Sequence, residues 1–274
     1  MVQETRFDVP GGTLYCRHTD IDASRPSVLF VHGLGESGLC FVEAFQEPAM
    51  SPYNLIVPDL LGFGRSTVDA GANFDFAAQV DRLCALLDAT RVGSCYLIGH
   101  SMGGGIGTEL CRLQPRRVDA FINFEGGLTP HDRFITNLAL QAERDGRFEA
   151  WLRDDFRRGK VQEWALRWPS CVRYAASVEM CLPQAFLGSA REIYRLYEAA
   201  PGSTAGLIGE RYRQLGVRRV FCWGAESLSP ESQRWLVEQS GLVQRRFDSA
   251  FHWVMLDRRE AFYQFVSGFL LGGR

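Results

Sequence analysis

The chain has 274 residues, of which 46% are hydrophobic and 23% charged, a composition typical of a globular protein. Its net charge of −2 excludes the basic surface that a nucleic-acid partner would require. No apolar run reaches the roughly 20 residues of a membrane helix, and the first residues lack the basic and apolar regions of a signal peptide. We therefore expect a cytoplasmic protein with no nucleic-acid or membrane partner, either a monomer or a homodimer.

The chain opens with a hairpin pattern and continues with apolar runs at the spacing of strands. Pro10, Gly11 and Gly12 form the expected turn of the hairpin. Further strands are predicted at 27–33, 54–59, 95–99, 118–125 and 217–224, with a weaker one at 243–249. Because most of these runs are almost continuously hydrophobic, we expect strands that are buried on both faces of a mostly parallel, eight-stranded sheet.

Segments with apolar residues at helical spacing separate these strands. One helix is expected to begin at Asn73 as its N-cap, and a second follows Ser101. Ser229 and Gly241 mark the start and the end of a third, and residues 257–270 form the last. The alternation of strands and helices predicts a doubly wound α/β fold.

The alternation stops after residue 128. From 129 to about 202, helical patterns rich in aromatic residues are separated by prolines, without a clear strand. We therefore expect an α/β core made of residues 1–128 and 203–274, with residues 129–202 inserted as a helical cap over the carboxyl ends of the strands.

The eight cysteines are scattered and include no C-x-x-C pair, and most of them lie in apolar runs. They are expected to be small buried hydrophobic residues rather than zinc ligands or disulfides. No metal and no organic cofactor is implied.

The pentapeptide GHSMG at 99–103 follows an apolar strand pattern and precedes an amphipathic helix. A strand that turns into a helix at a single residue strains the backbone there, and its neighbours must be small. Gly99 and Gly103 meet that requirement. Ser101 is therefore expected at the carboxyl edge of the sheet as an exposed nucleophile.

Four motifs together resemble the α/β-hydrolase family over essentially the whole chain. They are HGLG at 32–35, PDLLGFGRS at 58–66, GHSMGG at 99–104 and FHWVMLD at 251–257, and they occur in the order of the family. The resemblance implies the α/β-hydrolase fold and a Ser-acid-His triad.

A histidine and a carboxylate must complete such a triad. Among five histidines, His252 follows the last strand and comes after the serine and the acid, so it is the expected general base and acid. Many relatives carry the acid after the seventh strand, where this chain has Ser227. Glu125, at the end of the sixth strand, is the preferred acid, as in relatives such as haloalkane dehalogenases, and Glu226 is the alternative.

The backbone N–H groups of Leu34 and Met102 are the expected oxyanion hole. Gly33 and Trp253, together with Trp164 and Trp168 of the inserted segment, are candidate contacts for the substrate.

The expected activity is the hydrolysis of a carboxylic ester or thioester of an apolar or aromatic acyl group through an acyl-enzyme intermediate. The small-molecule acyl substrate is either free or carried on a protein or on coenzyme A. Two alternatives stay open. The His-Trp sequence at 252–253 resembles that of hydrolases that cleave carbon–carbon bonds of ring-fission products. In addition, some proteins of this fold bind ligands without catalysis.

Overall fold

The expected strands form one sheet in a computed structural model that describes residues 2–239 and 241–272. The strand order is β1-β2-β4-β3-β6-β7-β8-β9, and β5 pairs with β2 outside this path. The strands are β1 (Val2–Val9), β2 (Gly12–Thr19), β3 (Ser27–Val31), β4 (Asn54–Pro58), β5 (Thr67–Val68), β6 (Cys95–His100), β7 (Val118–Phe124), β8 (Arg218–Gly224) and β9 (Gln244–Phe247).

The sheet is mostly parallel, as predicted. β4, β3, β6, β7, β8 and β9 are parallel neighbours, whereas the β1–β2 hairpin and the β2–β4 pair are antiparallel. The expected count of eight strands is wrong by one, because the sheet has nine strands within the described residues. The additional strand, β5, is two residues long, too short to produce an alternating pattern in the sequence.

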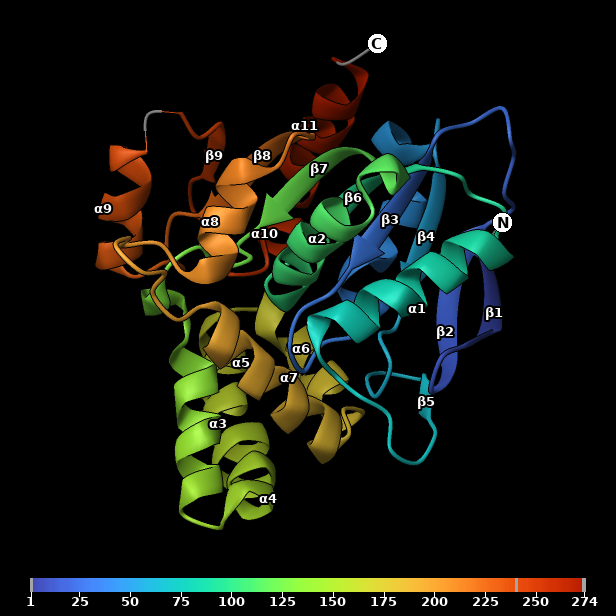
Figure 1. Cartoon of the computed structure of the whole chain (residues 1–274). Coiled ribbons are helices and arrows are strands. Elements are labelled where there is room, and N and C mark those ends of the chain that lie inside the picture. The colour runs from blue at the N-terminus through green and yellow to red at the C-terminus, as the bar shows by residue number, and fades with distance from the viewer. Residues whose placement is uncertain (1, 240, 273–274) are drawn as a thin grey trace.

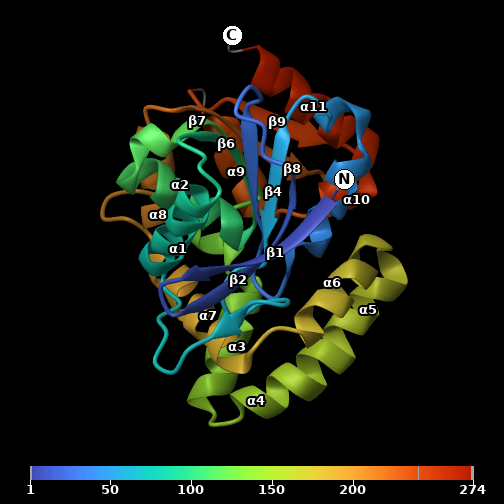
Figure 2. The same ribbon diagram turned by 90° about the vertical axis from the view of Figure 1, so that its right-hand side faces the viewer.

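Helices cover both faces of the sheet, which makes the fold doubly wound (Figure 1). In the turned view, α1, α2 and α8 lie on one side of the strands and α10 and α11 on the other (Figure 2). Their bounds are α1 (Phe76–Ala89), α2 (Met102–Leu113), α8 (Leu207–Gln214), α9 (Pro230–Glu238), α10 (Val254–Asp257) and α11 (Arg259–Leu271). Short 3-10 helices are η1 (Gly38–Gln46), η2 (Pro48–Met50), η3 (Pro115–Arg117) and η4 (Pro130–Asp132).

The N-cap of α1 differs from the prediction. Asp75, not Asn73, caps this helix, because its carboxylate accepts a hydrogen bond from the N–H of Ala78 at 2.7 Å. Asn73 instead donates to the Asp75 side chain, so the two residues form one turn ahead of the helix. Ser229 caps α9 as predicted.

The segment from 129 to 202 is helical, as its sequence indicates, and its helices gather at one end of the sheet (Figures 1 and 2). The prediction of a separate domain with these bounds stays a prediction. Residues 1, 240, 273 and 274, which fall within the predicted core and helix ranges, lie outside the described residues. The helices are α3 (Phe134–Arg144), α4 (Phe148–Ala150), the π-helix η5 (Trp151–Lys160), α5 (Val161–Arg167), α6 (Ser170–Glu179) and α7 (Pro183–Leu196).

The hydrophobic core occupies both sides of the sheet. Every residue of β3 and β4 is buried, which explains their continuous apolar sequences. All eight cysteines are free thiols, and all except the half-buried Cys84 are buried in this core. No helix among residues 2–239 and 241–272 is long and apolar enough to cross a membrane.

Candidate active site

Ser101 occupies the junction between β6 and α2. Its backbone has φ 53° and ψ −121°, a conformation that residues other than glycine rarely adopt. The chain can turn this sharply because its neighbours lack side chains. A Cβ on Gly99 would lie 2.3 Å from the carbonyl oxygen of Gly103, and a Cβ on Gly103 would lie 2.0 Å from that of Val31. The strained turn lifts the hydroxyl to the edge of the sheet.

The parallel strands bring distant loops to this same edge. β3, β6, β7 and β8 run in one direction, so the residues that follow them meet at their carboxyl ends. Glu125 follows β7 in a left-handed conformation with φ 52°, and its N–H donates to the carbonyl of Cys222 at 2.9 Å. His252 lies in the loop after β9.

The structure brings His252 and Glu125 into direct contact. His252 Nδ1 is hydrogen-bonded to Glu125 Oε2, and the Glu125 side chain is completely shielded from solvent. Because Nδ1 donates to the carboxylate, Nε2 of a neutral ring carries the free lone pair. The other oxygen, Oε1, accepts the N–H of Gly224 at 2.6 Å, which fixes the carboxylate.

The two alternatives for the acid are thereby separated. Glu226 is exposed, and among the described contacts its side chain makes no hydrogen bond to His252. Ser227 donates to Glu125 Oε2, and its hydroxyl lies 3.2 Å from His252 Nδ1. The residue at the expected position of the acid therefore supports the carboxylate that replaces it.

The loop after β3 carries the first candidate oxyanion donor. Buried His32 accepts the N–H of Leu60 at 2.8 Å and donates to the carbonyl of Gly33 at 2.9 Å. Tyr174 of α6 donates its hydroxyl to the carbonyl of Leu34 at 3.1 Å, which fixes the next peptide plane. The second candidate, Met102, is the first residue of α2, where N–H groups have no partner within the helix.

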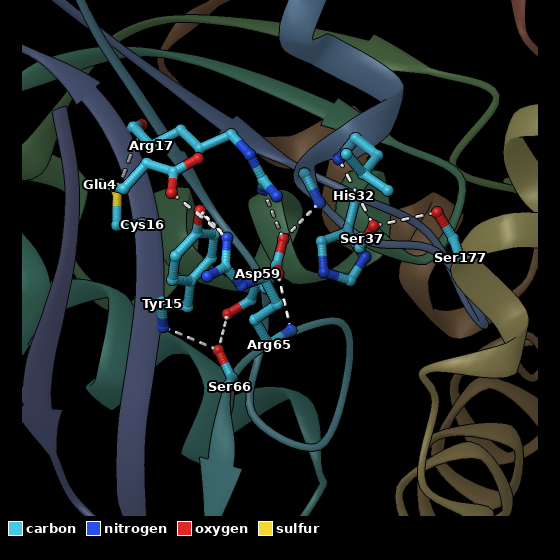
Figure 3. A network of polar contacts seen from close by, with 12 residues as sticks. Glu4, Tyr15, Cys16, Arg17, His32, Ser37, Asp59, Arg65, Ser66 and Ser177 are labelled. Carbon is cyan, nitrogen blue, oxygen red and sulfur yellow. Dashed lines mark hydrogen bonds and ion pairs between the residues drawn. The ribbon is translucent and has the colours of Figure 1, made fainter. Parts of the chain in front are cut away.

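A cluster of polar residues around Asp59 stabilises the loop after β3 (Figure 3). The buried Asp59 carboxylate accepts the N–H groups of Gly38 at 2.7 Å and Arg65 at 2.8 Å and pairs with Arg17 at 3.2 Å. Next to it, Ser37 is hydrogen-bonded to Ser177 of α6 at 2.9 Å. The loop is thus held by the core on one side and by the inserted helices on the other.

A cavity of about 420 Å³ opens between this edge of the sheet and the inserted helices. Ser101, Met102, Leu34, Glu125 and His252 all line it. Its other lining residues are mostly apolar and aromatic, and they include Phe134, Ile135, Trp164, Tyr174, Ile193, Tyr197, Leu228, Phe251 and Trp253.

The family of this chain follows from one match. A model described as the alpha/beta hydrolase fold matches residues 26–179, more than half of the chain. The chain belongs to the alpha/beta hydrolase fold family. The predicted fold is thereby confirmed.

This alpha/beta hydrolase is similar to proteins with several names. Epoxide hydrolase 1 of Siraitia grosvenorii is 32% identical over 147 residues, which cover 53% of this chain and 44% of that protein. The structure of epoxide hydrolase VrEH1 from Vigna radiata has a TM-score of 0.77 at 16% identity and covers 99% of this chain and 98% of that one. A carboxylesterase structure from Nitrososphaera gargenis has a TM-score of 0.76 at 17% identity and covers 98% of each.

These similarities differ in what they support. The solved structures match at low identity and therefore show the fold alone. The chain spans less than half of the length of the curated relatives it matches. The family model alone shows the family to which this chain belongs.

The predicted substrate contacts divide into two groups. Trp164 and Trp253 line the cavity, whereas Gly33 and Trp168 are not among the lining residues. The ring of Trp168 instead stacks on Phe251, with centroids 5.0 Å apart and planes at 7°. Trp168 thus packs behind the cavity wall, and the Gly33 N–H is already bonded to the Glu36 carboxylate at 2.6 Å.

The sequence analysis missed two residues of the site, Glu36 and Tyr174, and it missed the contact that Ser227 makes with Glu125. Glu36 follows HGLG directly, and a carboxylate beside an expected oxyanion hole was a usable signal. Tyr174 lies in the helical segment, where no motif connects it to the loop. In the described part of the chain, no group of three or more His, Cys, Asp or Glu side chains is arranged to hold a metal ion.

Proposed function

We propose that this family member is a serine hydrolase that cleaves carboxylic esters or thioesters of apolar or aromatic acyl groups. One observation carries the proposal. Ser101 and His252 line the same cavity, and the imidazole of His252 is hydrogen-bonded to the buried carboxylate of Glu125. A hydroxyl, an imidazole and a carboxylate in this order are the groups that acyl transfer requires.

In the proposed reaction, His252 Nε2 accepts the proton of Ser101 Oγ while this oxygen attacks the carbonyl carbon of the substrate. The carbonyl electrons move onto oxygen, where the N–H groups of Leu34 and Met102 stabilise the negative charge. When the intermediate collapses, the bond to the alcohol or thiol breaks, and the leaving group takes the proton from His252. Water then attacks the acyl-Ser101 ester by the same route and releases the carboxylic acid.

The composition of the cavity supports an apolar acyl group. Among the residues that the structure describes, no lysine or arginine lines it, whereas the carboxylates Glu36, Glu125 and Asp132 lie in its wall. A substrate carboxylate would lose its hydration there without gaining a lysine or arginine as a partner. The inserted helices carry much of the apolar lining, and we propose that they act as a cap that covers the substrate.

Ser101 also distinguishes this proposal from the activity in the names of two relatives. Two epoxide hydrolases are similar to this chain, but the family resemblance implies that such enzymes use aspartate where Ser101 stands. A serine at this position favours attack on an acyl carbon. The carbon–carbon alternative rests on the presence of Trp253 after His252. The indole N–H of Trp253 already donates a hydrogen bond to Glu36, so this residue has a role within the protein that does not depend on that activity.

A fluorophosphonate probe tests the proposal directly. We expect the probe to label the wild type and not Ser101→Ala, since it reacts only with an activated serine. Nitrophenyl esters of several chain lengths and a coenzyme A thioester then identify the acyl class, and a dienoic ring-fission ketone tests the carbon–carbon alternative. A wild type that neither reacts with the probe nor hydrolyses any ester would favour a binding protein.

The proposed base makes activity depend on pH in a definite direction. Burial lowers the pKa of the His252 imidazole, but Glu125, and more distantly Glu36 and Asp132, raise it, and the net direction is upward from the ordinary 6.5. The base must be unprotonated, so a raised pKa keeps it inactive to a higher pH. We expect kcat/KM for an uncharged ester to rise with pH through a midpoint above 6.5. A midpoint below that value in a pH–rate profile would contradict this role for His252.

A further inference from the structure

A second buried carboxylate lies in the wall of the cavity and has no part in the proposed reaction. Glu36 follows the HGLG loop, lines the cavity and is only 2% exposed. Burial opposes its charge, but His100 and the N–H of Gly33 hold the pKa of its carboxyl at about 2. Glu36 is therefore an anion inside the protein.

Three of the hydrogen-bond partners of Glu36 come from different segments of the site: the loop after β3, the end of β6 and the loop after β9. Its Oε2 accepts the N–H of Gly33 at 2.6 Å and His100 Nδ1 at 3.0 Å. Its Oε1 accepts the indole N–H of Trp253. Each partner is adjacent in the chain to a residue of the proposed mechanism: Gly33 to Leu34, His100 to Ser101 and Trp253 to His252.

His100 extends this connection to the backbone of the proposed base. Its Nε2 lies 2.9 Å from the carbonyl oxygen of His252, and its ring is completely buried. A carboxylate and a carbonyl oxygen only accept hydrogen bonds, so both ring nitrogens of His100 donate. His100 thus links the Glu36 carboxylate to the backbone of His252. The rings of His100 and His252 lie next to each other, with centroids 4.6 Å apart.

General stability does not account for such a pair. A buried carboxylate bonded to an imidazole contributes little to stability over well-packed apolar side chains, because both groups lose their hydration. What the pair does provide is a fixed geometry. From these contacts we infer that Glu36 is a positioning residue. It fixes the relative positions of the loop that carries Leu34, the turn at Ser101 and the loop that carries His252, as acyl transfer requires. This inference rests on the proposed serine hydrolase function.

Glu36→Gln tests the inference with a side chain of nearly equal size. The amide presents an NH₂ group either to the Trp253 N–H or to the N–H groups of Gly33 and His100, so one contact becomes donor against donor. We expect kcat per active site to fall by about 10- to 100-fold, since small misplacements of reacting groups cost that much. KM should change by less than about threefold, because the acyl cavity is preserved.

Glu43→Gln is the matched control. Glu43 lies in η1, seven positions after Glu36, is largely buried and pairs with Arg173 at 2.6 Å, but it does not line the cavity. Its loss removes a charge and an ion pair from the same region of the fold. We expect kcat per active site of Glu43→Gln to stay at the wild-type value. If the effect of Glu36→Gln came only from the loss of a buried charge in this region of the fold, Glu43→Gln would lower kcat as well.

Trp253→Phe provides a second, independent variant, which removes only the indole N–H from the network and keeps an aromatic ring in the cavity wall. Alone it should lower kcat. Combined with Glu36→Gln it should cost nothing more, because the amide NH₂ then faces no opposing N–H. Additive losses in this cycle would overturn the inference.

Titration of active sites with the fluorophosphonate probe separates the two proposals. It counts competent sites in each variant, so a poorly folded fraction does not enter kcat. If the wild type reacts and Glu36→Gln retains full kcat, the positioning role fails and the proposed function stands. If the wild type neither reacts nor hydrolyses esters, the proposed function itself fails.

Discussion

Glu125→Gln is expected to lower kcat for ester hydrolysis by about 10⁴-fold, the loss typical when the acid of a triad loses its charge. The amide would present its NH₂ to His252 or to the N–H of Gly224, and the imidazole would lose the partner that fixes its tautomer. Steady-state kinetics with a nitrophenyl ester, normalised to the folded protein, measures the effect. Glu226→Gln, which alters an exposed carboxylate, should retain most activity.

Ser227 allows a sharper version of this experiment. Its hydroxyl is 3.2 Å from His252 Nδ1, so an aspartate at this position places a carboxylate within reach of the same nitrogen. We expect Glu125→Gln/Ser227→Asp to recover at least about 100-fold of the lost kcat. If Glu226→Gln were inactive and Glu125→Gln active, the assignment of the acid would be wrong.

Gly103→Ala is expected to destabilise the protein by about 3 kcal/mol, near the upper end of the usual cost of overpacking. The new Cβ would lie 2.0 Å from the carbonyl oxygen of Val31 and 2.8 Å from that of His32. Both are backbone atoms, so α2 must move away from β3, and Ser101 moves with it. Urea unfolding monitored by circular dichroism measures the free energy of unfolding.

Gly268→Ala is the control for this substitution. Gly268 lies in α11, and a Cβ there would meet nothing within 4 Å. Alanine in an exposed helix should stabilise by up to about 1 kcal/mol. Equal changes for Gly103→Ala and Gly268→Ala would mean that the contact between α2 and β3 is not the reason for the glycine.

The fold could be predicted from the sequence because its main strands and the turn at Ser101 follow from local patterns of residues. Continuous apolar runs identified β3, β4 and β6, and the glycines around Ser101 identified the turn. Glu125 was preferred as the acid because an apolar strand delivers it to the carboxyl edge, and its side chain does reach His252.

What the sequence could not provide depends on contacts between distant segments. Tyr174 is 140 positions from Leu34, and Trp253 is 217 positions from Glu36, so no local pattern links either pair. The choice of Asp75 over Asn73 as N-cap depends on one turn of backbone geometry, because both residues suit that position. The sequence also contains no signal for the direction of the Trp168 ring, which stacks on Phe251 and does not line the cavity.

The short loop between β7 and α3 has a consequence for engineering. It carries Glu125, and four residues later Thr129 is hydrogen-bonded to Ser232 of α9, which also donates to Asp132. The start of the helical segment 129–202 is therefore hydrogen-bonded to α9. A chimera that replaces the helices of this segment with those of another family member should be spliced after Asp132, since a junction placed earlier would remove the hydrogen bonds of Thr129 and Asp132 to Ser232.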